Sequence, residues 1–168
     1  FVQLLDLLDA GGHRFALPAN SRVLDTGGFK NLSREVPPAE FYGRLTRAFG
    51  VPPEWCVNMY GMTELSSQFY DDGNARTPSV KRAMPWLRAR AVDPLSGRDV
   101  PHGTPGVLAH HDLAHLGVVS AILTEDVGVM GDDGGVLLLG RVGGAEAKGC
   151  SLALDAFLDA ARAPADVP

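Results

Sequence analysis

The run at residues 60–64, Tyr-Gly-Met-Thr-Glu, places a hydroxyl and a carboxylate directly after a glycine. A strand-like segment at 55–60 leads into this run, and glycine permits a sharp turn at its end. Polar groups at such a turn lie at the carboxyl edge of a sheet, where α/β proteins bind ligands. A carboxylate there can hold Mg²⁺, and a hydroxyl can donate to a phosphate oxygen. The alternative is a plain loop in which Thr63 and Glu64 favour the N-terminus of a helix.

Two further short motifs also follow apolar segments. Thr124-Glu125-Asp126 comes after the apolar run 118–123, which is predicted to be a strand. An aspartate just past a buried strand is well placed to accept both hydroxyls of a ribose. Arg141 follows a second apolar strand, and its planar guanidinium suits ribose oxygens or a phosphate. Taken singly, each motif also fits a strand-ending turn or a surface arginine.

Gly27 and Gly28 lie in the run Thr-Gly-Gly-Phe-Lys, where backbone could approach a flat ring or a phosphate. The run lacks the glycine spacing of a dinucleotide fingerprint or a P-loop, so a simple turn is the alternative. Cys150 could be a nucleophile if Lys148 or a helix N-terminus stabilises its thiolate, or it could be a small buried side chain. Cys56, inside an apolar strand, is predicted to be inert core.

Three histidines, His110, His111 and His115, lie within six residues of one another. Two of them are four apart, as metal ligands on a helix can be. No glutamate-bearing metalloprotease pattern accompanies them, and the segment borders a strand. A solvated loop is therefore favoured over a metal site.

The first part of the chain, 1–72, predicts a parallel α/β layer. A helix is expected over 1–9 before Gly11-Gly12, and a buried strand over 22–25. The clearest helix spans 37–49, with prolines in its first turn and Gly50 as its cap. Its apolar face is predicted to consist of Phe41, Leu45, Ala48 and Phe49.

The remainder predicts a different layer. Short strands at 86–92, 106–110 and 135–139 alternate with turns, which indicates a small antiparallel, barrel-like subdomain over 73–150. A short helix capped by Ser151 and a frayed tail are expected over 151–168. The predicted fold class is α/β: a partial parallel α/β layer followed by a small β-rich subdomain.

Composition excludes several classes of protein. The chain has 168 residues, 45% hydrophobic and 21% charged, with a net charge of -5. Neither a disordered tail nor a nonspecific nucleic-acid binder fits these values. No apolar stretch is long enough to span a membrane, and no signal peptide is visible. Two cysteines without metal spacing make a cytoplasmic location the expectation. Because the chain begins with Phe1, its natural N-terminus is expected to lie upstream.

In combination, these motifs resemble those of the adenylate-forming superfamily. The run 60–64 resembles its Tyr-Gly-x-Thr-Glu motif, and Thr124-Glu125-Asp126 resembles its Ser/Thr-Gly-Asp motif with Glu125 in place of glycine. Gly140-Arg141 resembles its Gly-Arg motif. The residues within and beside these motifs are similar to those of the LuxE-type acyl-protein synthetases. These are fatty-acid-activating subunits of bioluminescent fatty acid reductases. The resemblance covers roughly residues 22–157.

The resemblance implies ATP and Mg²⁺ as cofactors and a carboxylic acid as substrate. The acid would attack the α-phosphorus, release pyrophosphate and then pass its acyl group to a thiol, with an acyl-accepting or reductase protein as partner. Glu64 would help hold Mg²⁺ and Thr63 would contact the α-phosphate. The residues implied at the nucleotide are Gly27, Gly28, Tyr60 and Gly61 at adenine and Asp126 and Arg141 at the ribose. Cys150 is the implied candidate acceptor.

The sequence also departs from the superfamily. It has no Ser/Thr/Gly-rich phosphate loop, no late catalytic lysine and no aspartate shortly after Arg141. The chain is therefore expected to be the C-terminal part of an acyl-protein synthetase, slow or inactive alone and with apolar surface exposed where the absent half would pack. The alternatives are a relative of the aryl- or acyl-CoA ligases and a non-catalytic nucleotide-binding or interface remnant.

Overall fold

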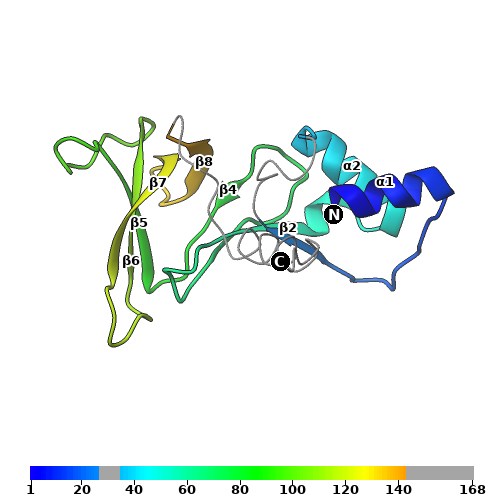
Figure 1. Cartoon of the computed structure of the whole chain (residues 1–168), viewed down its shortest axis with the longest axis horizontal. Helices are drawn as coiled ribbons and strands as arrows, with labels where there is room; N and C mark the ends of the chain where they lie inside the picture. Colours follow the sequence, from blue (N-terminus) through cyan, green and yellow to red (C-terminus); the bar gives the residue numbers. More distant parts are fainter. Residues whose placement is uncertain (27–34, 143–168) are drawn as a thin grey trace, which may run out of the picture.

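The computed structural model describes residues 1–26 and 35–142. Gly27, Gly28, Cys150 and the predicted C-terminal helix lie outside these ranges. The described chain is elongated, with its helices at one end and most of its antiparallel strands at the other (Figure 1). None of its helices in these ranges is long and apolar enough to cross a bilayer.

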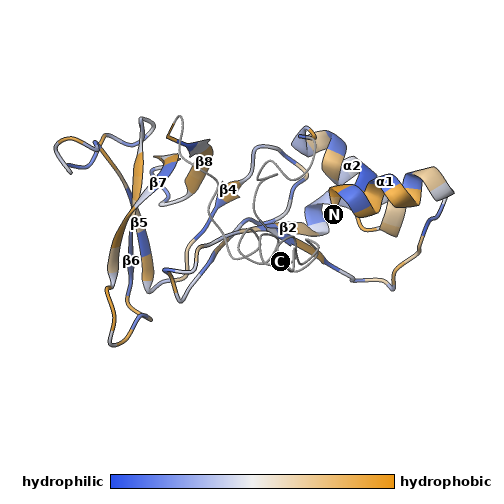
Figure 2. Ribbon diagram, viewed as in Figure 1, coloured by the Kyte–Doolittle hydropathy of each residue, from blue (hydrophilic) through white to orange (hydrophobic). Residues whose placement is uncertain are grey.

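Two helices pack together at one end of the molecule. Helix α1 spans Val2–Gly11 and helix α2 spans Pro38–Phe49, and each ends at a glycine in the left-handed conformation. Both predicted helices are confirmed. Figure 2 shows both hydrophobic and hydrophilic residues along these helices. The predicted apolar face of α2 is rotated, because the residues that it buries are Tyr42, Arg44, Leu45 and Ala48.

Arg44 explains why a cation lies on this buried face. Its guanidinium donates to the carboxylates of Asp6 and Asp9 on α1, at 2.7 and 3.0 Å. The pairing lets the helices stay close without leaving the charge unneutralised. Phe41 and Phe49, which are predicted to lie on the apolar face, are partly buried and pack against this core.

A small mixed sheet lies against the helices. Strand β1 (Val23–Thr26) runs parallel to β2 (Cys56–Tyr60), and β3 (Phe69–Tyr70) pairs antiparallel with β2. The predicted parallel pairing is confirmed for β1 and β2, but the sheet is mixed because β3 is antiparallel. The expectation of a fully buried β1 is wrong, since Val23 is buried but Leu24 is 55% exposed.

The second sheet is antiparallel, with the strand order β4-β8-β7-β6-β5. Its strands are β4 (Val80–Lys81), β5 (Leu87–Val92), β6 (Pro105–Asp112), β7 (Ala121–Met130) and β8 (Val136–Arg141). The sheet curls into half of a barrel and has its own core, which includes Leu87, Leu108, Met130 and Val136. The predicted antiparallel layer is confirmed.

The boundaries of β7 correct one prediction. Thr124-Glu125-Asp126 lies inside this strand and not past its end. Val118 and Val119, predicted to open the strand, are exposed and precede it. The apolar side chains at 118–123 predict burial, whereas alternate residues from Ala121 to Glu125 face solvent.

A buried ion pair joins the two sheets. The Lys81 ammonium on β4 lies 2.6 Å from a carboxylate oxygen of Asp71, just after β3, and the two side chains are 4% and 1% exposed. Lys81 also donates to the Asn58 carbonyl on β2. Burial alone would raise the pKa of Asp71, but hydrogen bonds from Lys81, Ser79 and the Asn58 N–H outweigh it and lower that pKa.

Candidate functional site

Three of the predicted site residues meet at the junction of the two sheets. The Tyr60 hydroxyl, at the end of β2, donates to Asp126 Oδ2 at 2.7 Å, although the two residues are 66 positions apart. Arg141 Nε, at the end of β8, donates to Asp126 Oδ1 at 3.1 Å. Asp126 and Arg141 are directly opposite in the β7–β8 ladder. The structure therefore assembles a tyrosine, a carboxylate and a guanidinium from three strands.

Thr124 gives Asp126 its position. The β6–β7 pairing passes from Val107 opposite Val127 to Ala109 opposite Leu123, so β7 has extra residues between these pairs. Thr124 Oγ1 donates to the Leu108 carbonyl at 2.8 Å and accepts from the Asp126 N–H at 3.0 Å. The hydroxyl thus replaces ladder bonds that the irregularity removes. This role gives a physical reason for a serine or threonine two residues before the aspartate.

Gly140 positions Arg141, as Thr124 positions Asp126. The β7–β8 pairing shifts register between Val127 and Gly128. Gly140 takes φ 124° there, a conformation that side-chain-bearing residues rarely adopt. The glycine before the arginine is therefore required by the backbone, and it turns Arg141 toward Asp126.

The electrostatics favour a protonated tyrosine beside an accessible ion pair. Burial, and then the neighbouring Asp126 carboxylate, raise the pKa of Tyr60 above its usual range. Tyr60 therefore remains a donor at every physiological pH. The side chains of Asp126 and Arg141 are 16% and 34% exposed, so a ligand can still reach them.

Thr63 and Glu64 lie in the exposed turn that follows β2. The alternative that they begin a helix is wrong, because this turn leads into β3. Asp112 on β6 anchors the next residues, accepting from the N–H groups of Ser66 and Ser67 at 3.0 and 2.8 Å. The turn is thus held by the second sheet, on the same junction as Tyr60.

The prediction of a solvated loop for the histidine segment is wrong for His110 and His111, which lie in β6, whereas His115 lies in the turn that follows this strand. His110 is fully buried, and its Nε2 lies 3.2 Å from the Tyr60 hydroxyl. His111 is exposed on the other face of β6. In the described ranges, no group of three histidine, cysteine or acidic residues could hold a metal ion. Sequence reasoning missed His110, although burial of Leu108, His110 and Asp112 follows the period of two expected of a strand.

The outcomes for the remaining predicted residues differ. Cys56 is fully buried, as expected, and burial raises the pKa of its thiol to about 11. Gly61 follows Tyr60 at the junction, with Gln68 against it. Gly27, Gly28 and Cys150 lie outside the described residues.

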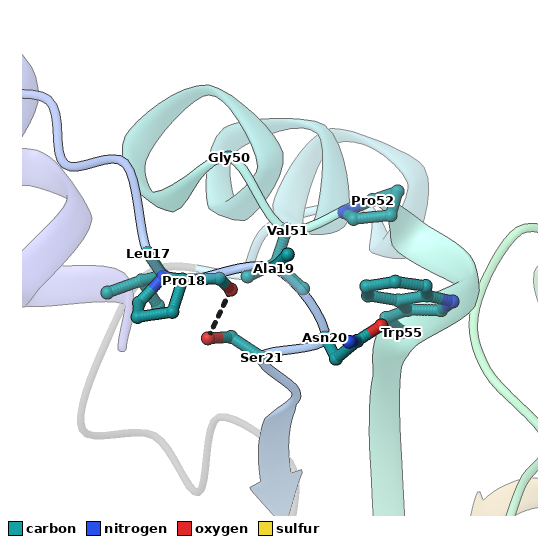
Figure 3. Close-up of a pocket in the computed structure, with 9 residues that line it drawn as sticks. All are labelled: Leu17, Pro18, Ala19, Asn20, Ser21, Gly50, Val51, Pro52 and Trp55. Carbon is teal, nitrogen blue, oxygen red and sulfur yellow. Dashed lines mark hydrogen bonds between the residues drawn. The ribbon is translucent and has the colours of Figure 1, made fainter.

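A small pocket lies away from this junction. It is lined by residues 17–21 before β1 and by residues 50–52 and Trp55 before β2 (Figure 3). These segments precede the two parallel strands, whereas Tyr60 ends one of them. The pocket is therefore at the opposite edge of the small sheet and contributes nothing to the candidate site.

Comparison with protein-family models identifies the family of this chain. The family model for the LuxE acyl-protein synthetases matches residues 3–158. The long-chain-fatty-acid–luciferin-component ligase of Vibrio harveyi is 26% identical over 140 residues, which cover 79% of this chain and 36% of that protein. The protein of the same name from Aliivibrio fischeri is 27% identical over 110 residues, 64% of this chain and 28% of the relative. The chain thus spans about a third of the curated relatives it matches.

Solved structures show the same fold. McyG A-PCP complexed with phenylalanyl-adenylate matches with a TM-score of 0.60 and 15% identity, over 84% of this chain and 29% of that one. Apo MatB from Rhodopseudomonas palustris matches with a TM-score of 0.52 and 19% identity, over 73% of this chain and 26% of that one. With the family match over nearly its whole length, this chain belongs to the LuxE acyl-protein synthetase family.

Proposed function

We propose that this chain supplies the ribose-holding part of an ATP-dependent acyl-protein synthetase. In this function a fatty acid is activated as its acyl-adenylate and its acyl group is then passed to a protein thiol. The observation that supports it is the contact of Tyr60, Asp126 and Arg141 at the junction of the sheets. The curated relatives are named as ligases of a long-chain fatty acid, which supports that substrate class.

The hydrogen-bonding capacity of Asp126 fits a ribose. A carboxylate has roughly four acceptor positions. Tyr60 takes one on Oδ2 and Arg141 takes one on Oδ1, which leaves a free position on each oxygen. The 2′- and 3′-hydroxyls of a ribose are adjacent donors that match this pair. Arg141 and Tyr60 hold the carboxylate in place before the nucleotide arrives, which lowers the cost of binding.

The remaining roles at the nucleotide, the metal ion and the acyl acceptor are proposed relative to the ribose position at Asp126. Gly27, Gly28 and Gly61 would lie along the adenine, and Thr63 would donate to the α-phosphate. Glu64 has an exposed carboxylate in the turn after β2, a donor type suited to Mg²⁺. Mg²⁺ on the phosphates would neutralise charge while the fatty acid carboxylate attacks the α-phosphorus and pyrophosphate leaves. Cys150 is the candidate acyl acceptor, with coenzyme A as the alternative acceptor in a CoA-ligase relative.

Binding of an adenylate mimic tests the proposal directly. The probe is dodecanoyl-sulfamoyl-adenosine, titrated calorimetrically into the chain, with its 2′,3′-dideoxy analogue as the ligand control. Asp126→Asn removes a charged acceptor and should weaken binding by about ten- to a hundredfold. The matched variant Glu125→Gln changes the adjacent exposed carboxylate of the same strand and should bind like the wild type. Equal affinity of Asp126→Asn and wild type, or of the two ligands, would exclude the ribose role.

A further inference from the structure

His110 lies directly behind the candidate ribose site without facing it. His110 is a residue of β6 and is fully buried, and its Nε2 is 3.2 Å from the Tyr60 hydroxyl. Tyr60 in turn lies 2.7 Å from Asp126. His110 therefore contacts the residue that holds the carboxylate, and not the position where a ribose would lie.

The direction of each hydrogen bond follows from counting hydrogens. A phenol has a single hydrogen, and the shorter contact with the charged Asp126 carboxylate takes it. The contact between Tyr60 and His110 must then be an Nε2–H that donates to the phenol oxygen. Thr124 is also beside this oxygen, but its hydroxyl hydrogen is given to the Leu108 carbonyl.

The surroundings of His110 also favour the tautomer that has its hydrogen on Nε2. Burial lowers the pKa of His110 to about 4, so the ring is neutral at physiological pH and has one N–H. Its Nδ1 is buried without a hydrogen-bond partner in the described part of the chain. A bare acceptor costs less to bury there than an orphaned N–H, which places the hydrogen on Nε2.

The ring is also held in place by its neighbours. The Phe69 and Tyr60 rings lie 5.1 and 5.8 Å from it, centroid to centroid. Ala89 and Ile122 are its partners on the strands to either side. These contacts bury the imidazole and restrict its rotation, with Nε2 toward the Tyr60 hydroxyl.

We propose that His110 is a positioning residue: its Nε2–H fixes the Tyr60 hydroxyl as the donor that orients Asp126. That Asp126 then holds a ribose rests on the proposed function, whereas the orientation of Tyr60 does not. His110 acts through Tyr60 and touches no substrate atom.

The first test needs no nucleotide. Long-range ¹⁵N–¹H spectra of the imidazoles should show His110 in the Nε2–H form, unchanged from pH 5.5 to pH 8. In ¹³Cζ-tyrosine spectra, the Tyr60 signal should shift in His110→Leu and return toward its wild-type position in His110→Gln, whose amide nitrogen replaces the donor. The same changes at exposed His111 are the controls. An Nδ1–H tautomer, or a titration near pH 6.5, would overturn the proposal.

The second test measures the coupling to the ligand. His110→Leu should weaken dodecanoyl-sulfamoyl-adenosine about three- to tenfold, and His110→Gln should restore most of this loss. In a Tyr60→Phe background, His110→Leu should have little further effect, because the hydroxyl through which it acts is gone. Equal losses in both backgrounds would mean a general packing role. If the wild type does not bind the ligand, the ribose role fails, while the spectra still decide how Tyr60 is oriented.

Discussion

Replacement of Lys81 by methionine should destabilise the protein in a way that depends on pH. The Lys81 ammonium lies 2.6 Å from Asp71, and both side chains are almost completely buried. Methionine fills nearly the same volume but leaves the Asp71 carboxylate without its cation. Removing one partner of a buried pair typically costs about 3–5 kcal/mol, because the remaining charge stays uncompensated.

The pH dependence follows from the pKa of Asp71. In the wild type that pKa is lowered, so Asp71 contributes stability above the unfolded pKa, and this contribution is lost as the pH falls through the folded pKa. In Lys81→Met, burial continues to raise the pKa while the two contributions from Lys81 are gone. The carboxyl then takes up a proton at higher pH than in the wild type. The cost of the substitution should therefore be largest at pH 7 and shrink toward pH 4.

Urea unfolding at pH 7, 5.5 and 4 measures the cost at each pH. Arg82→Met is the matched control, since Arg82 is the next residue and makes exposed ion pairs with Asp72 and Asp133. Its effect should be small and should decrease with salt. Adding Asp71→Asn to Lys81→Met should recover part of the lost stability by removing the stranded charge. A cost for Lys81→Met that is the same at pH 7 and pH 4 would refute this account of the pair.

Two more substitutions or modifications test the packing around the site. Asp112→Asn replaces one carboxylate oxygen by an NH2 group, which faces either the N–H groups of Ser66 and Ser67 or the N–H of Ala114, so it should cost about 1–3 kcal/mol in urea unfolding. A stability equal to the wild type would mean that Asp112 does not anchor this turn. Cys56, with its buried thiol of raised pKa, should resist iodoacetamide in the native protein and react in guanidinium, as measured by peptide mass. Native labelling within minutes would contradict the described packing.

The elements set by local signals were predictable from the sequence. Helix α2 begins after Pro37 and ends at Gly50 because proline suits a first turn and glycine suits a left-handed cap. The pairing of Asp126 with Arg141 was predictable from family resemblance and not from spacing, whereas Tyr60 was expected at the adenine and its contact with Asp126 was not predicted. Nothing local indicates that Tyr60 and Asp126 should touch across 66 positions.

The supporting residues could not be predicted, because each depends on a contact between distant parts of the chain. His110 meets Tyr60 across 50 positions, and Asp112 meets Ser67 across 45. From the sequence alone, a histidine and an aspartate such as His110 and Asp112 are expected on the surface. Only their contacts with distant residues explain why they are buried. The register shifts of β7 are likewise set by its two neighbouring strands, so the sequence of β7 alone predicted the wrong end for it.

The candidate site is made by two sheets that are joined by the Lys81–Asp71 ion pair and by a backbone bridge between Tyr70 and Arg82. Tyr60 comes from the small sheet, and Asp126 and Arg141 come from the larger one. A ligand that needs all three binds only while the sheets are docked, so its binding free energy is added to the free energy of docking. The linkage also works in reverse: a change that loosens the docking weakens the apparent affinity for the ligand in proportion to the fraction of molecules it undocks, however far from the ligand it lies. The affinity for the ligand thus reports on how stably the two sheets are docked.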